Sequence, residues 1–383
     1  MTGRVEKLHI RPSLCIKVRF ASSNCQKCLS VCPVNAIRFD DQSIKVISDC
    51  IGCEFCVAVC PNEVFSIPDK SNRDARDSGS LKCLYCSKLL ADEREASDPF
   101  PAGIIPCIGS IPSHFILTWI SEKQSPLKLV TMDCGKCAMK TGVSVFQNTK
   151  SEVISIVESL KIPIEPVIIQ EATQQDKINA RELYSQFLSE LEEGNKFSRR
   201  EFLITFRTPL FSKKTAEKPE SDPESDSLAS EKRLPERLSS VIAFYRENQG
   251  HVLNSANSPF FSEIEIEDSC TGCAACARVC PTEALSLKKV EKKVYLNWTP
   301  SHCTQCDLCK EVCSKDSITF FPGLDINRIL DESTTAVKTF YVNVCPECNR
   351  ENLLYEITAN CPYCQKEKNI IEQFSKIIYG EQY

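Results

Sequence analysis

The sequence contains very little histidine. Only four of its 383 residues are histidines, at positions 9, 114, 251 and 302. No two of them have the spacing of a metal-ligand pair, which argues against histidine-based metal catalysis. The sequence also has no G-x-G-x-x-G motif, no phosphate-binding loop and no serine–histidine–aspartate arrangement. We therefore predict that the chain is not catalytic on its own.

Long apolar runs are missing as well. No segment approaches the roughly 20 apolar residues that a membrane helix needs, and the N-terminal MTGRVEKLHI lacks the apolar core of a secretory signal. We expect a cytoplasmic protein without a transmembrane segment. The stretch SRREFL at 198–203 resembles a twin-arginine export motif, but Arg207 and Pro209 interrupt the apolar residues after it. We interpret it as the basic end of a helix, or alternatively as a docking handle for a partner.

Positive charge is not in excess. The formal net charge is −5, whereas proteins that bind the phosphate backbone of nucleic acids are normally basic. We therefore expect protein partners, namely redox enzyme subunits, and no nucleic acid. Peripheral association with a membrane through such a partner is left open.

Cysteine, in contrast, is abundant, with 25 residues. The cysteines form four blocks, at 15–60, 83–137, 270–313 and 345–364, and none lies between 138 and 269. Because thiols stay reduced in the cytoplasm, metal ligation is a better use for so many cysteines than disulfide bonding.

The blocks indicate a multidomain protein of the α+β and α/β classes. Residues 212–236 are polar, charged and interrupted by prolines, which predicts a flexible linker. The predicted parts are an N-terminal cluster module at 1–75, an α/β domain at 80–172, a helical segment at 173–211, the linker at 212–236, a second cluster module at 237–325, and a ribbon with a terminal helix at 336–383.

Two blocks carry the spacing C-x2-C-x2-C-x3-C, which occurs at 50–60, 270–280 and 303–313. Such a tight loop turns three thiolates toward one [4Fe–4S] cluster, while the fourth points to another cluster. Gly52 and Gly272 fit the tight loop because glycine tolerates a positive φ. Zinc sites usually use two separated C-x2-C pairs instead. A fourth, shortened motif at 25–32 has Ser22 where the leading cysteine would stand.

These two blocks resemble bacterial two-cluster ferredoxins, and the alternating segment 285–298 fits the hairpin of their βαββαβ order. The resemblance implies that each cluster takes three cysteines from one motif and one from the other. The missing ligand of the shortened motif would be Cys15, and that site could hold [4Fe–4S] or [3Fe–4S]. The four implied ligand sets are Cys32, Cys50, Cys53 and Cys56; Cys15, Cys25, Cys28 and Cys60; Cys270, Cys273, Cys276 and Cys313; and Cys280, Cys303, Cys306 and Cys309.

Residues 81–170 alternate between apolar strands and helical segments. We expect strands at 104–109, 127–134 and 164–170 and helices at 113–123 and 143–160, which together predict a small parallel sheet. Cysteines follow the strands, at the edge where α/β sheets place their sites. These five thiols could hold a [2Fe–2S] cluster, a larger cluster or structural zinc; they are Cys83, Cys86, Cys107, Cys134 and Cys137.

This segment resembles the delta (iron–sulfur) subunit of methyl-viologen-reducing hydrogenase. The matching features are CLYC, then IPCIG, then the strand that leads into DCGKC, a helix, and the apolar segment at 164–170. The family usually has more glycines and a histidine after the last cysteine, whereas Ala138 and Met139 follow Cys137 here. The resemblance implies an electron-relay cluster at a contact between subunits.

The last block consists of two C-x2-C pairs that are twelve residues apart. Four thiolates in this arrangement predict a tetrahedral structural site in a zinc ribbon, with a rubredoxin-like iron as the alternative. The segment at 370–380 predicts an amphipathic helix that could dock on a partner. The four cysteines are Cys345, Cys348, Cys361 and Cys364.

Taken together, the motifs predict an iron–sulfur electron-transfer subunit. It would relay single electrons between subunits of an anaerobic oxidoreductase, such as a hydrogenase, a formate dehydrogenase or a heterodisulfide-reductase-like complex. One alternative is a regulatory or assembly protein with labile clusters and no electron flux. Another is an oxidoreductase with its own site among the cysteines at 83–137.

Overall fold

The protein was analysed as a computed structural model. Residues 212–233 of the predicted linker lie outside the described residues, and only its last three residues, 234–236, are described. The SRREFL stretch at 198–203 also lies outside the described residues. The described residues are 8–40, 43–67, 83–90, 100–194, 234–248, 260–322, 326–354 and 360–379.

The N-terminal module spans residues 8–67 and has the predicted order of strands and helices. Two short antiparallel pairs, β1 with β4 and β2 with β3, frame the helices. Its small core contains Ile37, Ile44 and Phe65 together with Cys15. The elements are β1 (His9–Ile10), η2 (Pro12–Leu14), α1 (Ile16–Arg19), α2 (Lys27–Val31), β2 (Ile37–Asp40), β3 (Ser43–Val46), α3 (Phe55–Val59) and β4 (Phe65–Ser66).

The C-terminal module, residues 260–322, repeats the same order. Its outer strands β9 and β12 pair antiparallel with Ile266 opposite Ile318, and the predicted hairpin is formed by β10 and β11 with Leu285 opposite Trp298. These apolar side chains form one buried cluster. The elements are β9 (Ser262–Ile266), α9 (Ala275–Val279), β10 (Leu285–Val290), β11 (Lys293–Trp298), η7 (Pro300–His302), α10 (Leu308–Glu311) and β12 (Ile318–Pro322).

The α/β unit contains the predicted parallel sheet, with strand order β6-β5-β7-β8. The expectation of a parallel sheet is thus confirmed. Leu127 and Leu129 of β7 are fully buried, as expected for a strand covered by helices on both faces. The elements are β5 (Leu84–Cys86), η3 (Ser87–Leu90), β6 (Ile104–Ile105), η4 (Ile108–Ser110), α4 (Ser113–Lys123), β7 (Leu127–Thr131), η5 (Cys134–Lys136), α5 (Thr141–Ser159), β8 (Val167–Glu171) and α6 (Gln174–Gly194).

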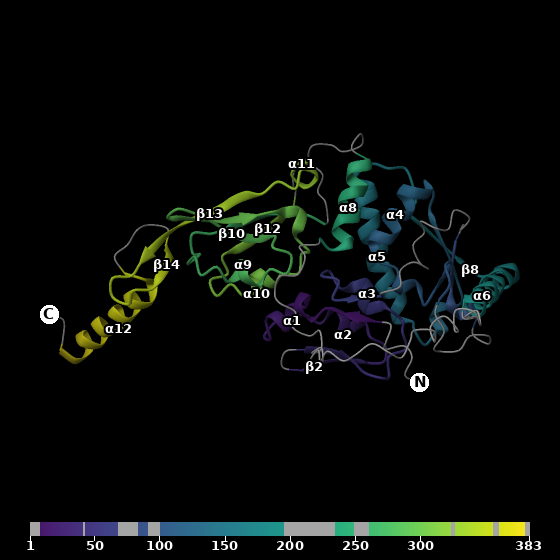
Figure 1. The fold of residues 1–383 in the computed structure, drawn as a ribbon, viewed down its shortest axis with the longest axis horizontal. Helices are drawn as coiled ribbons and strands as arrows, with labels where there is room; N and C mark the ends of the chain where they lie inside the picture. Colours follow the sequence, from purple (N-terminus) through teal and green to yellow (C-terminus); the bar gives the residue numbers. More distant parts are fainter. Residues whose placement is uncertain are drawn as a thin grey trace, which may run out of the picture.

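One hydrophobic core joins the α/β unit to both modules. Helix α8 (Glu236–Glu247) packs along α4, and the two stand side by side in Figure 1. The same core takes in Phe55 from α3, Phe261 before β9, and Ile329 from α11 (Ile326–Leu330). The halves on either side of the predicted linker are therefore packed against each other.

The C-terminal ribbon is attached to the C-terminal module through a shared strand. Strand β13 (Thr335–Val344) pairs with β11 along its first part and with β14 (Glu351–Leu354) along its last part. The result is a four-stranded sheet in the order β10-β11-β13-β14. Helix α12 (Pro362–Tyr379) comes after the ribbon and extends away from the body, at the opposite end from α6 (Figure 1).

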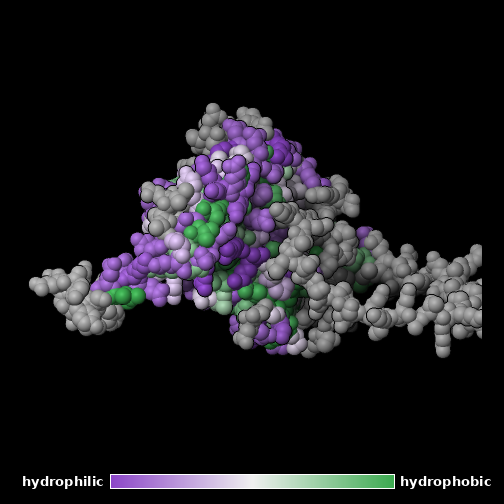
Figure 2. Space-filling model, turned by 60° about the vertical axis from the view of Figure 1, so that its left-hand side comes forward, coloured by the Kyte–Doolittle hydropathy of each residue, from purple (hydrophilic) through white to green (hydrophobic). Residues whose placement is uncertain are grey.

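The face shown in Figure 2 is largely hydrophilic, with hydrophobic colour confined to small patches. In the described part of the chain, no helix has the length and apolar character needed to cross a bilayer.

Candidate metal centres

The C-terminal module contains a hollow lined by four thiols from both of its motifs. Apolar residues, among them Leu296 and Phe340, form its walls. Three of the thiols belong to the loop before α9, and the fourth comes from the end of the second motif. They are Cys270, Cys273, Cys276 and Cys313.

A second hollow in the same module is lined by the other four thiols of its two motifs. The rings of Trp298 and Phe320 line it, with centroids 5.8 Å apart. Here three thiols come from the second motif and one from the first. They are Cys303, Cys306, Cys309 and Cys280.

When no cation is present, the surroundings of these hollows disfavour the charged thiolate form of the cysteines. Burial, followed by repulsion from Cys270, raises the pKa of Cys276 to about 12. Burial also raises the pKa of Cys303 to about 12, with repulsion from Cys280 contributing. Metal ligation requires thiolates, so a positively charged centre is what would make four thiolates stable here. The hollows and their donors fit an iron–sulfur cluster.

The cysteine loops obtain their curvature from residues with positive φ. Gly52 and Gly272, which the sequence singled out, have φ of 64° and 68°. Gln305 takes the same place in the third loop with φ of 53°, although it is not glycine. The shortened first motif is built differently, because Gln26 before α2 has φ of −130°, whereas Glu54 at the same place before α3 has φ of 64°.

The last cysteine of three motifs accepts a hydrogen bond from the backbone four residues later. The N–H groups of Ala36, Val64 and Ser317 donate to the sulfurs of Cys32, Cys60 and Cys313 at 3.2, 3.5 and 3.4 Å. Hydrogen bonds to sulfur stabilise the thiolate and tune the potential of a bound cluster. The repeat shows that the N- and C-terminal modules present their sulfurs in the same way.

In the N-terminal module the thiols of both motifs and Cys15 lie near one another. Burial, followed by repulsion from Cys60, Cys25 and Cys15, raises the pKa of Cys28 to about 12. Burial likewise raises the pKa of Cys56, and the thiols that repel it include Cys53, Cys50, Cys28 and Cys32. Each of these two thiols therefore has neighbours from both motifs.

Cys15 occupies the place that the shortened motif leaves open. It lies between η2 and α1 and is only 8% exposed. Burial raises the pKa of its thiol, and Cys25 is among the groups whose charge acts on it. The two elements before and after Cys15 thus bring a distant thiol to the motif that lacks its leading cysteine.

The α/β unit brings four of its five cysteines together. Burial raises the pKa of Cys107 to about 12, and the thiols that repel it include Cys86, Cys137 and Cys134. Cys86 ends β5, and the other three follow β6 and β7, so all four lie at the carboxyl edge of the sheet. Cys83 precedes β5 and acts instead on the hydroxyl of Tyr85. It lies at the other end of the strand, roughly 10 Å of chain from Cys86.

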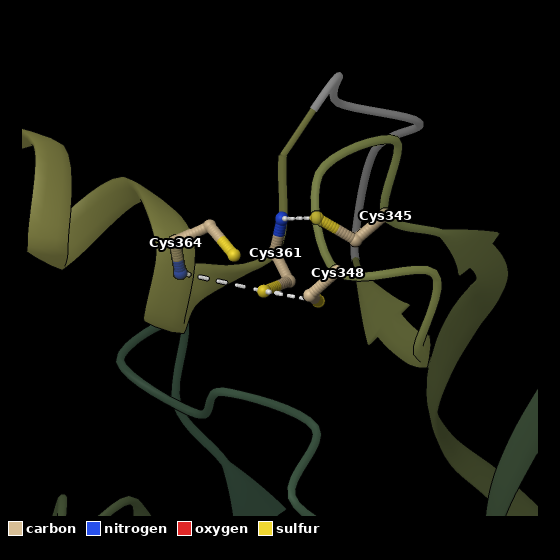
Figure 3. A group of neighbouring side chains, drawn as sticks. All are labelled: Cys345, Cys348, Cys361 and Cys364. Atoms are coloured by element: carbon tan, nitrogen blue, oxygen red, sulfur yellow. Dashed lines mark hydrogen bonds between the residues drawn. The ribbon is translucent and has the colours of Figure 1, made fainter.

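The ribbon cysteines form a much tighter group. Figure 3 shows the four sulfurs of Cys345, Cys348, Cys361 and Cys364 pointing toward one another. All four lie within 4.8 Å of one another, and in the described part of the chain no other group of cysteine, histidine or carboxylate ligands is this compact. The sulfurs of Cys348 and Cys361 are 3.7 Å apart. A tetrahedral ion with metal–sulfur bonds of about 2.3 Å would separate them by about 3.8 Å. The group fits one ion.

Two polar residues near these centres had no signal in the sequence. Thr304 Oγ1 donates a 2.6 Å hydrogen bond to Asn62 Oδ1, and both side chains are buried. Asn62 follows Cys60 by two positions, and Thr304 lies between Cys303 and Cys306. Because 242 positions separate the two residues, no pattern of local spacing predicts their contact.

Comparison with known proteins agrees with the geometry of the C-terminal module. Residues 269–317 match the family model described as a 4Fe-4S dicluster domain. The chain is also similar to Ferredoxin-3 of Nostoc sp. (strain PCC 7120), at 30% identity over 80 residues, which cover 82% of that protein and 17% of this chain. The matched range contains both cysteine motifs that line the two hollows. The chain belongs to the ferredoxin family of 4Fe-4S dicluster proteins.

Proposed function

We propose that this protein relays single electrons between subunits of an oxidoreductase. The observation that carries the proposal is the crossed composition of the two hollows in the C-terminal module. Each is lined by three thiols of one motif and one thiol of the other. This is the ligand pattern by which two-cluster ferredoxins hold a pair of [4Fe–4S] clusters.

Four sets of residues would hold four [4Fe–4S] clusters. Such a group, when bound, accepts and releases one electron at a potential that its surroundings set. The set with Cys15 could also hold [3Fe–4S]. The sets are Cys32, Cys50, Cys53 and Cys56; Cys15, Cys25, Cys28 and Cys60; Cys270, Cys273, Cys276 and Cys313; and Cys280, Cys303, Cys306 and Cys309.

The protein's own residues prepare these sites in two ways. Apolar walls such as Trp298 and Phe320 exclude water from the sulfurs. Backbone N–H groups, for example those of Ala36 and Ser317, donate hydrogen bonds to sulfur. Such bonds favour extra negative charge at the centre and therefore raise its reduction potential.

Two further sites complete the proposal. Cys86, Cys107, Cys134 and Cys137 would hold an additional cluster, [2Fe–2S] or another iron–sulfur type, because their sulfurs share the carboxyl edge of the sheet. The compact ribbon group would hold a structural zinc ion, with rubredoxin-like iron as the alternative.

The partners would be the other subunits of an anaerobic oxidoreductase. The resemblance of residues 80–172 to the delta subunit of a hydrogenase supports a hydrogenase, a formate dehydrogenase or a heterodisulfide-reductase-like complex. The formal net charge of −5 favours a protein partner over nucleic acid. The proposed compartment is the cytoplasm, where the thiols stay reduced.

The test is anaerobic isolation of the native protein with whatever binds it. Iron, acid-labile sulfide and zinc are measured per chain, and electron paramagnetic resonance (EPR) spectra are recorded at stepwise potentials. Reversible one-electron reduction, together with flavin, molybdenum or nickel–iron subunits in stable ratio, would support the relay. Labile clusters without reversible reduction, accompanied by chaperones or apo-enzymes, would instead favour the regulatory or assembly alternative.

A further inference from the structure

The N- and C-terminal modules meet directly beside two of their thiol sets. Asn62 and Thr304, joined by their 2.6 Å hydrogen bond, are 3% and 9% exposed. A hollow beside them is lined by Pro61, Cys303 and Gln305, among others. The contact is thus buried and lies next to the cysteines of both modules.

Neighbouring groups hold this contact in place. The guanidinium of Arg237 lies 4.8 Å from the ring centroid of Phe260 and donates a 2.7 Å hydrogen bond to Glu152. The backbone N–H of Arg237 donates to the Glu63 carboxylate at 2.8 Å. Glu63 directly follows Asn62, so α8 ties the N-terminal module to the start of the C-terminal one. The geometry of the contact does not depend on the Asn62–Thr304 hydrogen bond alone.

Asn62 lies near a thiol of each module. Its backbone N–H faces the sulfur of Cys60, which belongs to the N-terminal set, and favours the thiolate there. Its side chain lies near Cys306, which belongs to the C-terminal set, and favours the charged form of that thiol. The hydroxyl of Thr304 interacts with the same thiol. One short residue therefore spans the distance between two proposed centres.

The other sets are neighbours as well. The thiols of Cys53 and Cys107 lie close enough for their charges to interact, which links the α/β set to the first N-terminal set. Cys56 and Cys28 link the two N-terminal sets, and Cys309 and Cys276 link the two C-terminal sets. The Asn62 contact joins these groups into one series from the α/β unit to the C-terminal module.

We propose that Asn62, supported by Thr304, is the residue through which the two halves exchange electrons. This inference rests on the proposed relay function. In the exchange, the centre that Cys60 and its partners would hold would give up one electron, and the centre that Cys306 and its partners would hold would accept it, or the reverse. No covalent bond forms or breaks, and no proton has to move. Asn62 acts as a positioning residue that fixes the path between the two sulfurs.

The test compares Asn62→Ala with a matched control. Thr282→Val is that control, because Thr282 also stands two positions after the last cysteine of a motif, and its hydroxyl lies 3.7 Å from the Cys280 sulfur. Iron and sulfide are counted per chain, EPR redox titrations give the potential of each centre, and pulse radiolysis gives the electron-transfer rate between the halves.

In Asn62→Ala with full iron content, we expect a lower potential of the centre that contains Cys306, a changed magnetic coupling between the halves and a severalfold slower transfer between them. Thr282→Val acts on the same centre through Cys280, so a shift of the potential of that centre is expected. The transfer rate between the halves should change only as far as this shift in potential accounts for. Unaltered coupling and rate in fully loaded Asn62→Ala would overturn the inference.

A second variant covers the case in which Asn62→Ala loses iron. Thr304→Val keeps the volume of the side chain and removes the hydroxyl that binds Asn62. It is expected to slow the transfer between the halves, and Thr304→Ser is expected to restore it. Equal rates in Thr304→Val and wild type would again overturn the inference. If the wild type itself shows no reversible reduction, the proposed relay function fails, which is a different outcome.

Discussion

The ring of Phe55 lies against the backbone of Gly142. A Cβ atom at position 142 would be 2.7 Å from Cζ of Phe55 and 2.6 Å from the Cys107 sulfur. A Cβ at Gly109 would similarly meet Phe55 at 2.9 Å. Two glycines of the α/β unit thus make room for one aromatic ring of the N-terminal module, and this ring is fully buried.

Gly142→Ala should destabilise the protein. Alanine stabilises a helix relative to glycine by about 1 kcal/mol, but overpacking a tight contact costs about 1–3 kcal/mol. We therefore expect the clash to outweigh the gain and the free energy of unfolding to fall. Anaerobic urea unfolding measures the free energy of unfolding. Gly135→Ala serves as the control, because its Cβ would meet only a side-chain oxygen of Asp133 at 3.2 Å. Equal stability of both variants would contradict the packing argument.

Phe55→Ala should be more damaging, because it removes a fully buried ring from the core shared by the modules and the α/β unit. Truncations of this kind cost about 3–5 kcal/mol. Limited proteolysis and unfolding of the apo and loaded protein are the appropriate measurements. A loss below about 1 kcal/mol would mean that the contact between the N-terminal module and the α/β unit is weaker than the core indicates.

Cys83→Ala and Cys107→Ala should differ in metal content. Cys107 lies among Cys86, Cys134 and Cys137, whereas Cys83 lies at the far end of β5 beside Tyr85. We expect Cys107→Ala to lose the iron of the α/β site and Cys83→Ala to retain it, as counted by elemental analysis and sulfide assay. Equal loss in both variants would place Cys83 in the site after all.

Cys15→Ala should change the centre that contains Cys28 and leave the remaining centres intact. Cys15 is the thiol that we propose as the missing ligand of the shortened motif, and its charge acts on the thiol of Cys28. Removing it should cost the iron that Cys15 would hold and leave a three-cysteine site with a distinct EPR spectrum. Ser22→Ala is the control, since Ser22 stands at the sequence position of the missing cysteine. An effect of Ser22→Ala with none of Cys15→Ala would reverse the assignment.

Cys348→Ser should remove one metal ion per chain without affecting the iron–sulfur centres. The ribbon sulfurs form a compact group of their own, and the loss of one ligand from a tetrahedral site lowers metal affinity strongly. Native mass spectrometry before and after the substitution gives the mass of the lost ion, which distinguishes zinc from iron. Retention of the ion would contradict a four-thiolate site.

Local sequence patterns predicted those parts of the structure that depend on short spacing. The cysteine loops, with Gly52 and Gly272 at positive φ, and the alternating strands and helices of the α/β unit follow from periods of two to four residues. The helix predicted at 113–123 has the bounds of α4, whereas the helix predicted at 143–160 begins two residues earlier, at Thr141, and ends at Ser159. Boundaries of this kind are set by one or two residues.

Contacts between distant segments were not accessible in the same way. The pairing of β13 with β11 and the packing of α8 on α4 depend on which surfaces meet after the units have formed. The contact of Asn62 with Thr304 is of the same kind, because neither residue belongs to a motif. Such contacts are selected by complementary shape and hydrogen bonding across the fold, which no single stretch of sequence records.

Strand β13 fixes the distance between the ribbon and the ferredoxin domain. Its ten residues span about 33 Å at the usual rise of a strand, and Tyr341 pairs on one side with Lys293 and on the other with Leu354. The two hydrogen-bonded ladders meet at this residue, so the ribbon cannot pivot without breaking one of them. A partner that binds the ribbon would therefore lie at a fixed distance and angle from the proposed centre that includes Cys270.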